Sequence, residues 1–129
     1  MVKYAVNMDD LYREQILDHY RNPRNLGKLK SVTVTAGDNI VSCGDRLSME
    51  LLIKTGKITD IKFQGEGCAI SMASASLLTE EVKNKKIADL KHLGKDDILK
   101  LLGINPTPTR LKCALLSLEV LHKAINQMR

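Results

Sequence analysis

Aromatic residues are scarce in this chain of 129 residues, which has one phenylalanine, three tyrosines and no tryptophan. Single-stranded nucleic acids bind proteins largely by stacking their bases on aromatic side chains. The net charge of +5 is also scattered along the chain, so we expect no nucleic-acid partner. The charge serves solubility or, alternatively, attracts an acidic protein to the basic segments 83–86 and 110–112.

Long apolar runs are absent as well. No stretch of eighteen apolar residues occurs, and the first residues, MVKYAVNMDD, lack the apolar core and cleavage site of a secretory signal. We therefore expect a cytoplasmic protein with no membrane partner. The length fits a single domain, 1–129, that buries an ordinary hydrophobic core.

Cysteines are few and odd in number: Cys43, Cys68 and Cys113. An odd number of cysteines in a chain without an export signal argues against a disulfide framework and leaves the thiols for metal or sulfur chemistry. The separations of 25 and 45 residues exclude a local zinc finger. A site shared by the three thiols must therefore be formed by the fold.

The spacing of apolar residues predicts the fold class. Helices are expected in residues 8–20, 69–83, 96–102 and from 110 toward the C-terminus. Strands are expected in residues 31–35, 47–53 and around 61–63, with turns at 37–39 and 54–57. This order predicts an α+β fold, in which helices pack on one face of a small antiparallel three-stranded sheet.

The three cysteines fall near the ends of these elements. Cys43 precedes the second strand, and Cys68 ends the glycine-rich loop 64–68 at the start of a helix. Cys113 lies in or just before the first turn of the last helix. A helix N-terminus carries partial positive charge and free amide groups, which favour the thiolate at Cys68 and Cys113. These positions suit metal binding or attack on sulfur.

Asp45 follows Cys43 after a single glycine, which lets the loop bend. Together with Cys43, Cys68 and Cys113 it supplies three thiolates and one carboxylate, enough for tetrahedral zinc or for the protein side of an iron–sulfur cluster. A hard carboxylate holds zinc or iron less firmly than a fourth thiolate would. The set therefore favours assembly and handover of a metal or cluster over permanent storage.

The same residues have plainer interpretations. Free cysteines are often core residues, and an isolated aspartate such as Asp45 suits a turn. Lys112 is either an exposed surface residue or an auxiliary cation that stabilises a thiolate or persulfide on Cys113. The three histidines are expected at the surface, at helix ends or in a polar connection rather than in the site: His19, His92 and His122.

Two other functions remain open at this point. One is a cysteine hydrolase or acyl transferase that uses Cys68, for which no histidine stands in a motif that would supply the base. The other is a structural zinc protein, which would bind its metal tightly and unfold when a chelator removes it.

Four short motifs stand at the element ends: DHYRNPRN at 18–25, CGD at 43–45, GEGCAIS at 65–71 followed by ASAS at 73–76, and RLKC at 110–113. In this order, over nearly the whole chain, they resemble the iron–sulfur cluster assembly scaffolds of the IscU and NifU N-terminal type. The resemblance implies a scaffold that accepts persulfide sulfur from a PLP-dependent cysteine desulfurase, combines it with iron and passes a transient [2Fe-2S] cluster to acceptor proteins.

Carried over residue by residue, the resemblance makes Cys43, Asp45, Cys68 and Cys113 the ligands of the cluster or of zinc. IscU proteins have a histidine before the third cysteine, where this chain has Lys112, a residue that cannot ligate while protonated. In this respect the chain is similar to SufU proteins, zinc-dependent sulfurtransferases that relay persulfide sulfur. The IscU resemblance favours Cys113 as the persulfide acceptor, and the SufU resemblance favours Cys43.

Two further departures concern the segment before the third cysteine. SufU proteins carry an insertion there that residues 83–109 lack, and the Leu-Pro-Pro-Val-Lys element that IscU proteins offer to a chaperone is replaced by NPTPTR at 105–110. The sequence therefore predicts either a cluster scaffold or a sulfurtransferase that relays sulfur without holding a cluster.

Overall fold

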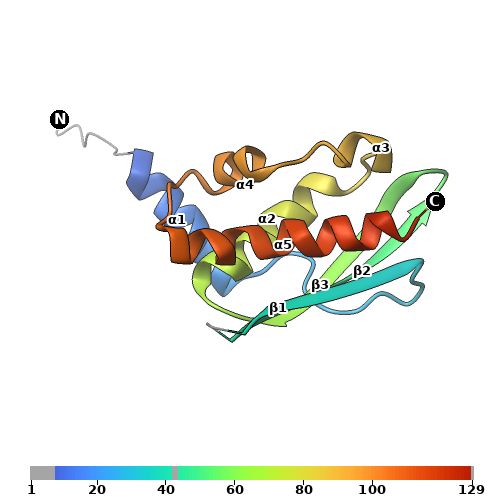
Figure 1. Ribbon diagram of the computed structural model, residues 1–129, viewed down its shortest axis with the longest axis horizontal. Helices are drawn as coiled ribbons and strands as arrows, with labels where there is room; N and C mark the ends of the chain where they lie inside the picture. The colour runs from blue at the N-terminus through green and yellow to red at the C-terminus, as the bar shows by residue number, and fades with distance from the viewer. Residues whose placement is uncertain (1–7, 42–43, 129) are drawn as a thin grey trace.

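The computed structural model describes residues 8–41 and 44–128 (Figure 1). It confirms the predicted α+β fold, whose three strands form one antiparallel sheet in the order β1-β2-β3. The elements, in chain order, are α1 (Met8–Arg21), β1 (Val34–Ile40), β2 (Asp45–Lys54), β3 (Lys57–Glu66), α2 (Ala69–Val82), α3 (Ile87–Leu90), α4 (Lys95–Leu102) and α5 (Pro108–Asn126).

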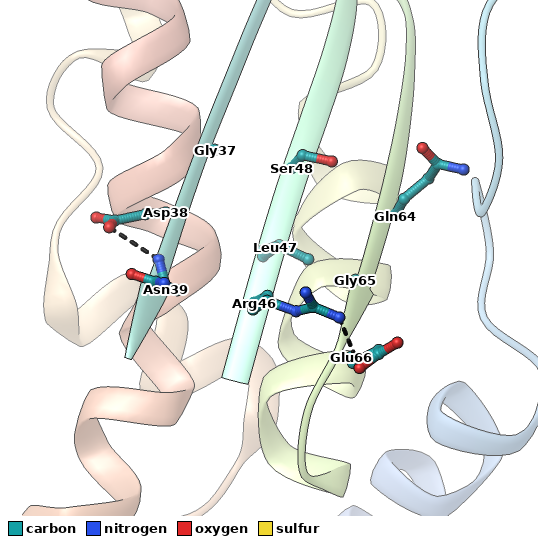
Figure 2. A pocket seen from close by; sticks show the side chains of 9 residues that line it. All are labelled: Gly37, Asp38, Asn39, Arg46, Leu47, Ser48, Gln64, Gly65 and Glu66. Atoms are coloured by element: carbon teal, nitrogen blue, oxygen red, sulfur yellow. Dashed lines mark hydrogen bonds and ion pairs between the residues drawn. The ribbon is translucent and has the colours of Figure 1, made fainter. Parts of the chain in front are cut away.

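The sheet has one buried and one open face. In β2 the odd-numbered residues from Asp45 to Leu51 point inward and are buried, because side chains alternate along a strand. The even-numbered ones, such as Arg46 and Ser48, point outward together with Gln64 of β3 (Figure 2). The β2–β3 hairpin turns at Thr55-Gly56, both with positive φ, as a type I′ turn requires.

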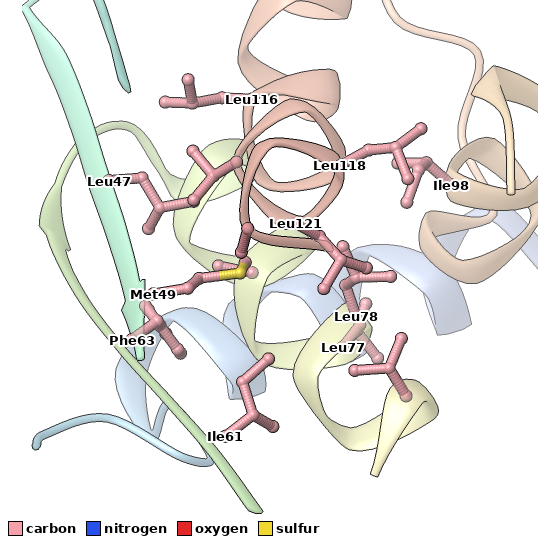
Figure 3. Packing of buried hydrophobic residues seen from close by; sticks show 14 of the residues in the cluster. Leu47, Met49, Ile61, Phe63, Leu77, Leu78, Ile98, Leu116, Leu118 and Leu121 are labelled. Atoms are coloured by element: carbon pink, nitrogen blue, oxygen red, sulfur yellow. The ribbon is translucent and has the colours of Figure 1, made fainter. Parts of the chain in front are cut away.

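Helices α2 and α5 cover the buried face of the sheet and contact each other (Figure 1). The core between them is formed by aliphatic residues and one phenylalanine, including Leu47, Met49, Phe63, Leu78, Leu116 and Leu121 (Figure 3). Helix α1 packs on α2, and α4 packs on both α2 and α5. The amino end of α2 and the first half of α5 are thereby held beside the start of β2.

Three details of the predicted fold are wrong. The first strand, expected at 31–35, runs over Val34–Ile40 instead, so the turn expected at 37–39 lies inside β1, where Gly37 pairs with Ser48 of β2. The loop expected from residue 64 begins later, because Gly65 continues β3 at a point where a side chain would contact the backbone of Arg46. The last helix begins at Pro108 instead of residue 110. Proline is tolerated at the first helical position, because the backbone amide that it lacks has no hydrogen-bond partner within the helix there.

The short helix α3 had no counterpart in the expected elements. Among the residues that the structure describes, no helix is long and apolar enough to cross a membrane.

Candidate metal centre

Three side chains from separate elements converge at one end of the sheet. Asp45 begins β2, Cys68 is the N-cap of α2, and Cys113 lies on α5. One ligand atom from each, a carboxylate oxygen or a sulfur, lies within 4.8 Å of the other two. The structure thus brings together three of the four expected ligands. The fourth, Cys43, lies outside the described residues.

The Asp45 carboxylate is buried, with 3% of the residue exposed. Its Oδ1 accepts a hydrogen bond from the backbone amide of Cys68 at 3.3 Å. Its Oδ2 is also buried and has no hydrogen-bond partner within the described parts of the chain. A buried carboxylate oxygen left in this state is costly unless a cation or a donor satisfies it. The orphaned oxygen therefore fits a metal ligand.

Gly67 permits the carboxylate to approach the start of α2. A Cβ at this position would contact Ser71 Oγ and would lie 3.0 Å from Cγ and 3.2 Å from Oδ1 of Asp45. No side chain larger than hydrogen fits there without displacing one of these groups. The glycine before Cys68 is thus explained by close packing, since its φ lies outside the range that favours glycine.

Cys68 occupies the position that was expected to favour a thiolate. As the N-cap of α2 it makes no side-chain cap, while Ser71 Oγ donates to its carbonyl oxygen at 3.0 Å. The first amide groups of the helix and its dipole therefore face the region around the sulfur. Cys68 is half-buried, so its sulfur lies at the rim of the site.

Cys113 differs from its expected position. Because α5 begins at Pro108, Cys113 is the sixth helical residue, and the helix dipole acts mainly within the first turn. Its sulfur lies 3.9 Å from the carbonyl oxygen of Thr109 and is buried, with 2% of the residue exposed. The helix dipole therefore acts on the region around Cys68 more than on that around Cys113.

The cation beside the thiols is Arg110 rather than Lys112. A hydrogen bond to the Cys68 sulfur raises the pKa of Arg110 above its usual range, and the charges of Cys68, Cys113 and Asp45 act in the same direction. Lys112 is exposed on the same helix. Arg110 precedes Cys113 by three positions and so shares its helix face, whereas the residue expected from the sequence was Lys112, which is adjacent to Cys113 in the chain.

The donor set fits zinc or iron. A tetrahedral site with metal–sulfur distances near 2.3 Å separates two sulfurs by about 3.8 Å, within the spread of the three atoms here. Two sulfurs and one carboxylate oxygen leave one position of a tetrahedron for a further ligand. The sequence analysis predicts that Cys43 fills that position, and this role stays a prediction.

A cavity lined by the outer residues of the three strands lies away from this site. It measures about 680 Å³ and opens on the outer face of the sheet, where Arg46 forms an ion pair with Glu66 at 2.8 Å (Figure 2). Arg46 follows Asp45 directly, but strand alternation turns the two side chains to opposite faces. The hollow therefore does not open onto the converging thiols.

The motif at 18–25 anchors α1 to α2. His19 Nδ1 lies 2.7 Å from Ser76 Oγ, and the backbone amide of Arg24 donates to the same oxygen at 2.9 Å. Asn25 Nδ2 donates to Thr79 Oγ1 at 3.1 Å. His19 lies in the last turn of α1, at the helix end where it was expected, and is half-buried in this network that connects α1 to α2.

Comparisons with known proteins match this fold. The family model described as NifU-like N terminal domain matches residues 11–129. The zinc-dependent sulfurtransferase SufU of Bacillus subtilis is 38% identical over 96% of this chain and 95% of that protein. The iron-sulfur cluster assembly enzyme IscU of Drosophila melanogaster is 39% identical over 89% of this chain and 76% of that protein. A crystal structure of a hypothetical protein has a TM-score of 0.80 at 31% identity, covering 92% of this chain and 98% of that one.

Proposed function

We propose, on the premise that the chain belongs to the family of NifU-like N-terminal domains, that it is an iron–sulfur cluster assembly scaffold. It accepts persulfide sulfur from a PLP-dependent cysteine desulfurase, combines it with iron and transfers a [2Fe-2S] cluster to acceptor proteins. The observation that carries the proposal is the convergence of Asp45, Cys68 and Cys113 within 4.8 Å. Thiolates with a carboxylate are a donor set for cluster iron and for zinc.

Sulfur enters by thiol exchange. A thiolate of this chain attacks the outer sulfur of the desulfurase persulfide, a new sulfur–sulfur bond forms, and the desulfurase leaves as a thiolate. This step needs no external oxidant or reductant. The acceptor is Cys43 or Cys113, while Cys68 and Asp45 hold the metal in either case. Cys113 is 2% exposed, so its sulfur must become more accessible before a persulfide can reach it.

Arg110 supplies positive charge where sulfur anions accumulate. Its guanidinium is exposed, and the Cys68 sulfur together with the charges of Cys113 and Asp45 raises its pKa. A cation in this place stabilises a thiolate before transfer and a persulfide after it. Reduction of the transferred sulfur to sulfide requires two electrons per sulfur, which a separate reductant must supply.

The carboxylate of Asp45 makes the site suitable for release. Zinc and iron prefer thiolate to carboxylate in soft sites, so the oxygen ligand is the weaker attachment. An acceptor protein that offers a thiolate can displace it first. The same single oxygen is poorly suited to permanent electron transfer or storage.

A zinc-dependent sulfurtransferase is the second candidate function. Two observations favour it: the Bacillus SufU protein is similar over 95% of its length, and Lys112 stands where IscU proteins have a histidine. The alignment to that protein extends over 141 residues, more than the 129 of this chain, so the relative has positions that this chain lacks. In this function zinc stays bound while sulfur passes through a thiol.

The test combines labelled sulfur with absorption spectroscopy. The full chain is incubated anaerobically with desulfurase and sulfur-labelled cysteine, first without a reductant to detect transferred sulfur and then with ferrous iron and dithiothreitol to detect a cluster. A scaffold acquires label and visible sulfur-to-iron absorption bands, whereas a zinc sulfurtransferase acquires label, keeps zinc and shows no such bands. A structural zinc protein acquires neither.

The variant that tests sulfur acceptance lacks both proposed acceptors. Cys43→Ala with Cys113→Ala is expected to lose the label, while omission of the desulfurase removes it from the wild type. Label retained by the double variant in the incubation without reductant contradicts the proposed acceptors. Absence of both label and sulfur-to-iron bands from the wild type contradicts the function itself.

A further inference from the structure

A buried pair of hydroxyl groups connects the two helices that carry Cys68 and Cys113. Ser74 on α2 donates to the carbonyl oxygen of Ala114 on α5 at 2.7 Å, and its Oγ lies 2.8 Å from Oγ of Ser117. These are ordinary lengths for hydroxyl hydrogen bonds. Ser74 is 2% exposed and Ser117 is 0% exposed, so water does not compete for either contact.

The hydrogens of this pair can be assigned from the partners. A carbonyl oxygen only accepts, and Ser74 has a single hydroxyl hydrogen, which must therefore go to Ala114. Ser117 is then the donor in the contact between the two hydroxyls. Helix α2 is thus joined to α5 by two hydrogen bonds that meet at one oxygen, Ser74 Oγ.

The pair lies close to both sulfur ligands along the two helices. Ala114 directly follows Cys113, and Ser74 comes six residues after Cys68, about 9 Å along the helix at 1.5 Å per residue. Sliding or rotation of α2 against α5 at this contact moves one sulfur relative to the other. A tetrahedral metal site tolerates only a small change in the distance between the two sulfurs, because the metal–sulfur bond lengths fix that distance.

We propose that Ser74 and Ser117 are positioning residues that fix the spacing of Cys68 and Cys113 for metal binding. This inference rests on the proposed function, since it assumes that both sulfurs bind the same metal or cluster. Neither hydroxyl touches the metal. Their effect passes through the relative placement of α2 and α5.

The test measures metal binding by the full-length chain with Ser74→Ala or Ser117→Ala. Zinc affinity is determined by competition with a chromophoric chelator, and cobalt(II) serves as a spectroscopic substitute for zinc. Each variant is expected to bind zinc about tenfold more weakly, the low end of the range for residues that orient metal ligands. The visible bands of bound cobalt should also shift, because they report ligand geometry.

Ser76→Ala is the matched control. Ser76 lies on the same helix, is 0% exposed and also has two hydrogen-bond contacts, but with His19 and Arg24 instead of α5. It should lower the melting temperature about as much as Ser74→Ala does, yet retain the wild-type zinc affinity and cobalt spectrum. A purely structural role of Ser74 would give the two variants the same metal binding.

The outcomes separate this inference from the proposed function. Suppose the wild type shows thiolate-to-cobalt bands, but Ser74→Ala and Ser117→Ala have the zinc affinity and cobalt spectrum of the wild type or of Ser76→Ala. The positioning role is then overturned, and the proposed function stands. If the wild type shows no thiolate-to-cobalt bands, the shared metal site is wrong, and both proposals fall with it.

Discussion

The carboxylate of Asp45 accepts a hydrogen bond from the backbone amide of Cys68, at 3.3 Å and across 23 positions of sequence. This contact joins the start of β2 to the N-cap of α2. It engages Oδ1 only, and the buried Oδ2 has no partner among the residues described. The fold therefore holds one oxygen of the carboxylate in place and leaves the other for a ligand, at a cost in stability.

Replacing Asp45 by asparagine separates these two contributions. Asp45→Asn keeps an oxygen that accepts from Cys68 but removes the negative charge. We expect zinc binding at least about tenfold weaker, because an anionic ligand is lost. The urea concentration at the midpoint of unfolding of the metal-free variant should equal or exceed that of the metal-free wild type, since a buried charge has been removed.

The control for this substitution is Asp38→Asn. Asp38 pairs with Lys123 at 2.9 Å, away from the converging thiols, so its loss should leave zinc affinity unchanged. Equal zinc affinity of Asp45→Asn and wild type, measured by chelator competition, would contradict the assignment of Asp45 as a ligand.

Arg110 should govern the reactivity of Cys68. Removal of its guanidinium in Arg110→Ala takes away the cation that interacts electrostatically with the sulfur, so alkylation of Cys68 by iodoacetamide near neutral pH should slow about three- to tenfold. The rate is followed by mass spectrometry of the peptide containing Cys68 in metal-free protein. Lys112→Ala removes the same charge two positions along the helix and should react at the wild-type rate. Similar slowing in both variants would show a general charge effect instead.

Much of the fold follows from local patterns. The hairpin was predictable because Leu47, Met49 and Leu51 alternate with polar residues at 48 and 50, shortly before the turn at Thr55-Gly56. Helix α2 was predictable because it follows a glycine-rich loop and carries apolar residues at helical spacing. Each of these signals lies within about fifteen residues, so no knowledge of distant contacts is needed.

The errors arise where distant contacts decide. Gly37 and Asp38 favour a turn locally, but pairing with β2 extends the strand through them, and Lys123 of α5 binds the Asp38 carboxylate. The start of α5 at Pro108 also shifted Cys113 away from the helix end. The environment of Cys68 was therefore predicted from local sequence, whereas that of Cys113 was not.

The site itself was predicted in two different ways. The chemistry of their side chains identified the cysteines and Asp45 as possible ligands. That they lie close together depends on how β2, α2 and α5 pack, which the spacing of residues in the sequence does not predict. The resemblance to a family supplied that prediction. Arg110 was missed, although its position three residues before Cys113 would have indicated it once the helix was extended to Pro108.

Gly67 should be intolerant of even the smallest side chain. Gly67→Ala places a methyl group against Ser71 Oγ and the Asp45 carboxylate, so one of them must move. We expect a loss of about 1–3 kcal/mol in the free energy of unfolding, together with weaker zinc binding. Gly94→Ala is the matched control, because nothing lies within 4 Å of the added carbon there. Wild-type zinc affinity in Gly67→Ala would show that the close approach does not shape the site.

The stability of the docked α1 should depend on pH through His19. Burial holds the pKa of His19 below its ordinary value, the charge of Arg24 acts in the same direction, and Asp18 and Glu80 oppose them. As the pH falls through the unfolded value near 6.5, the unfolded chain binds a proton that the folded chain does not. The free energy of unfolding therefore decreases with falling pH, until His19 is protonated in the folded state as well.

His19→Gln removes this titration while keeping a polar side chain near Ser76. Between about pH 7.5 and about pH 5.5 the free energy of unfolding of the metal-free variant should fall less than that of the wild type, as measured by urea denaturation at each pH. His92→Gln replaces an exposed histidine and should keep the wild-type pH dependence. A His19→Gln variant with the full wild-type dependence would mean that other groups cause the acid sensitivity, because the only proton uptake removed by the substitution is that of residue 19.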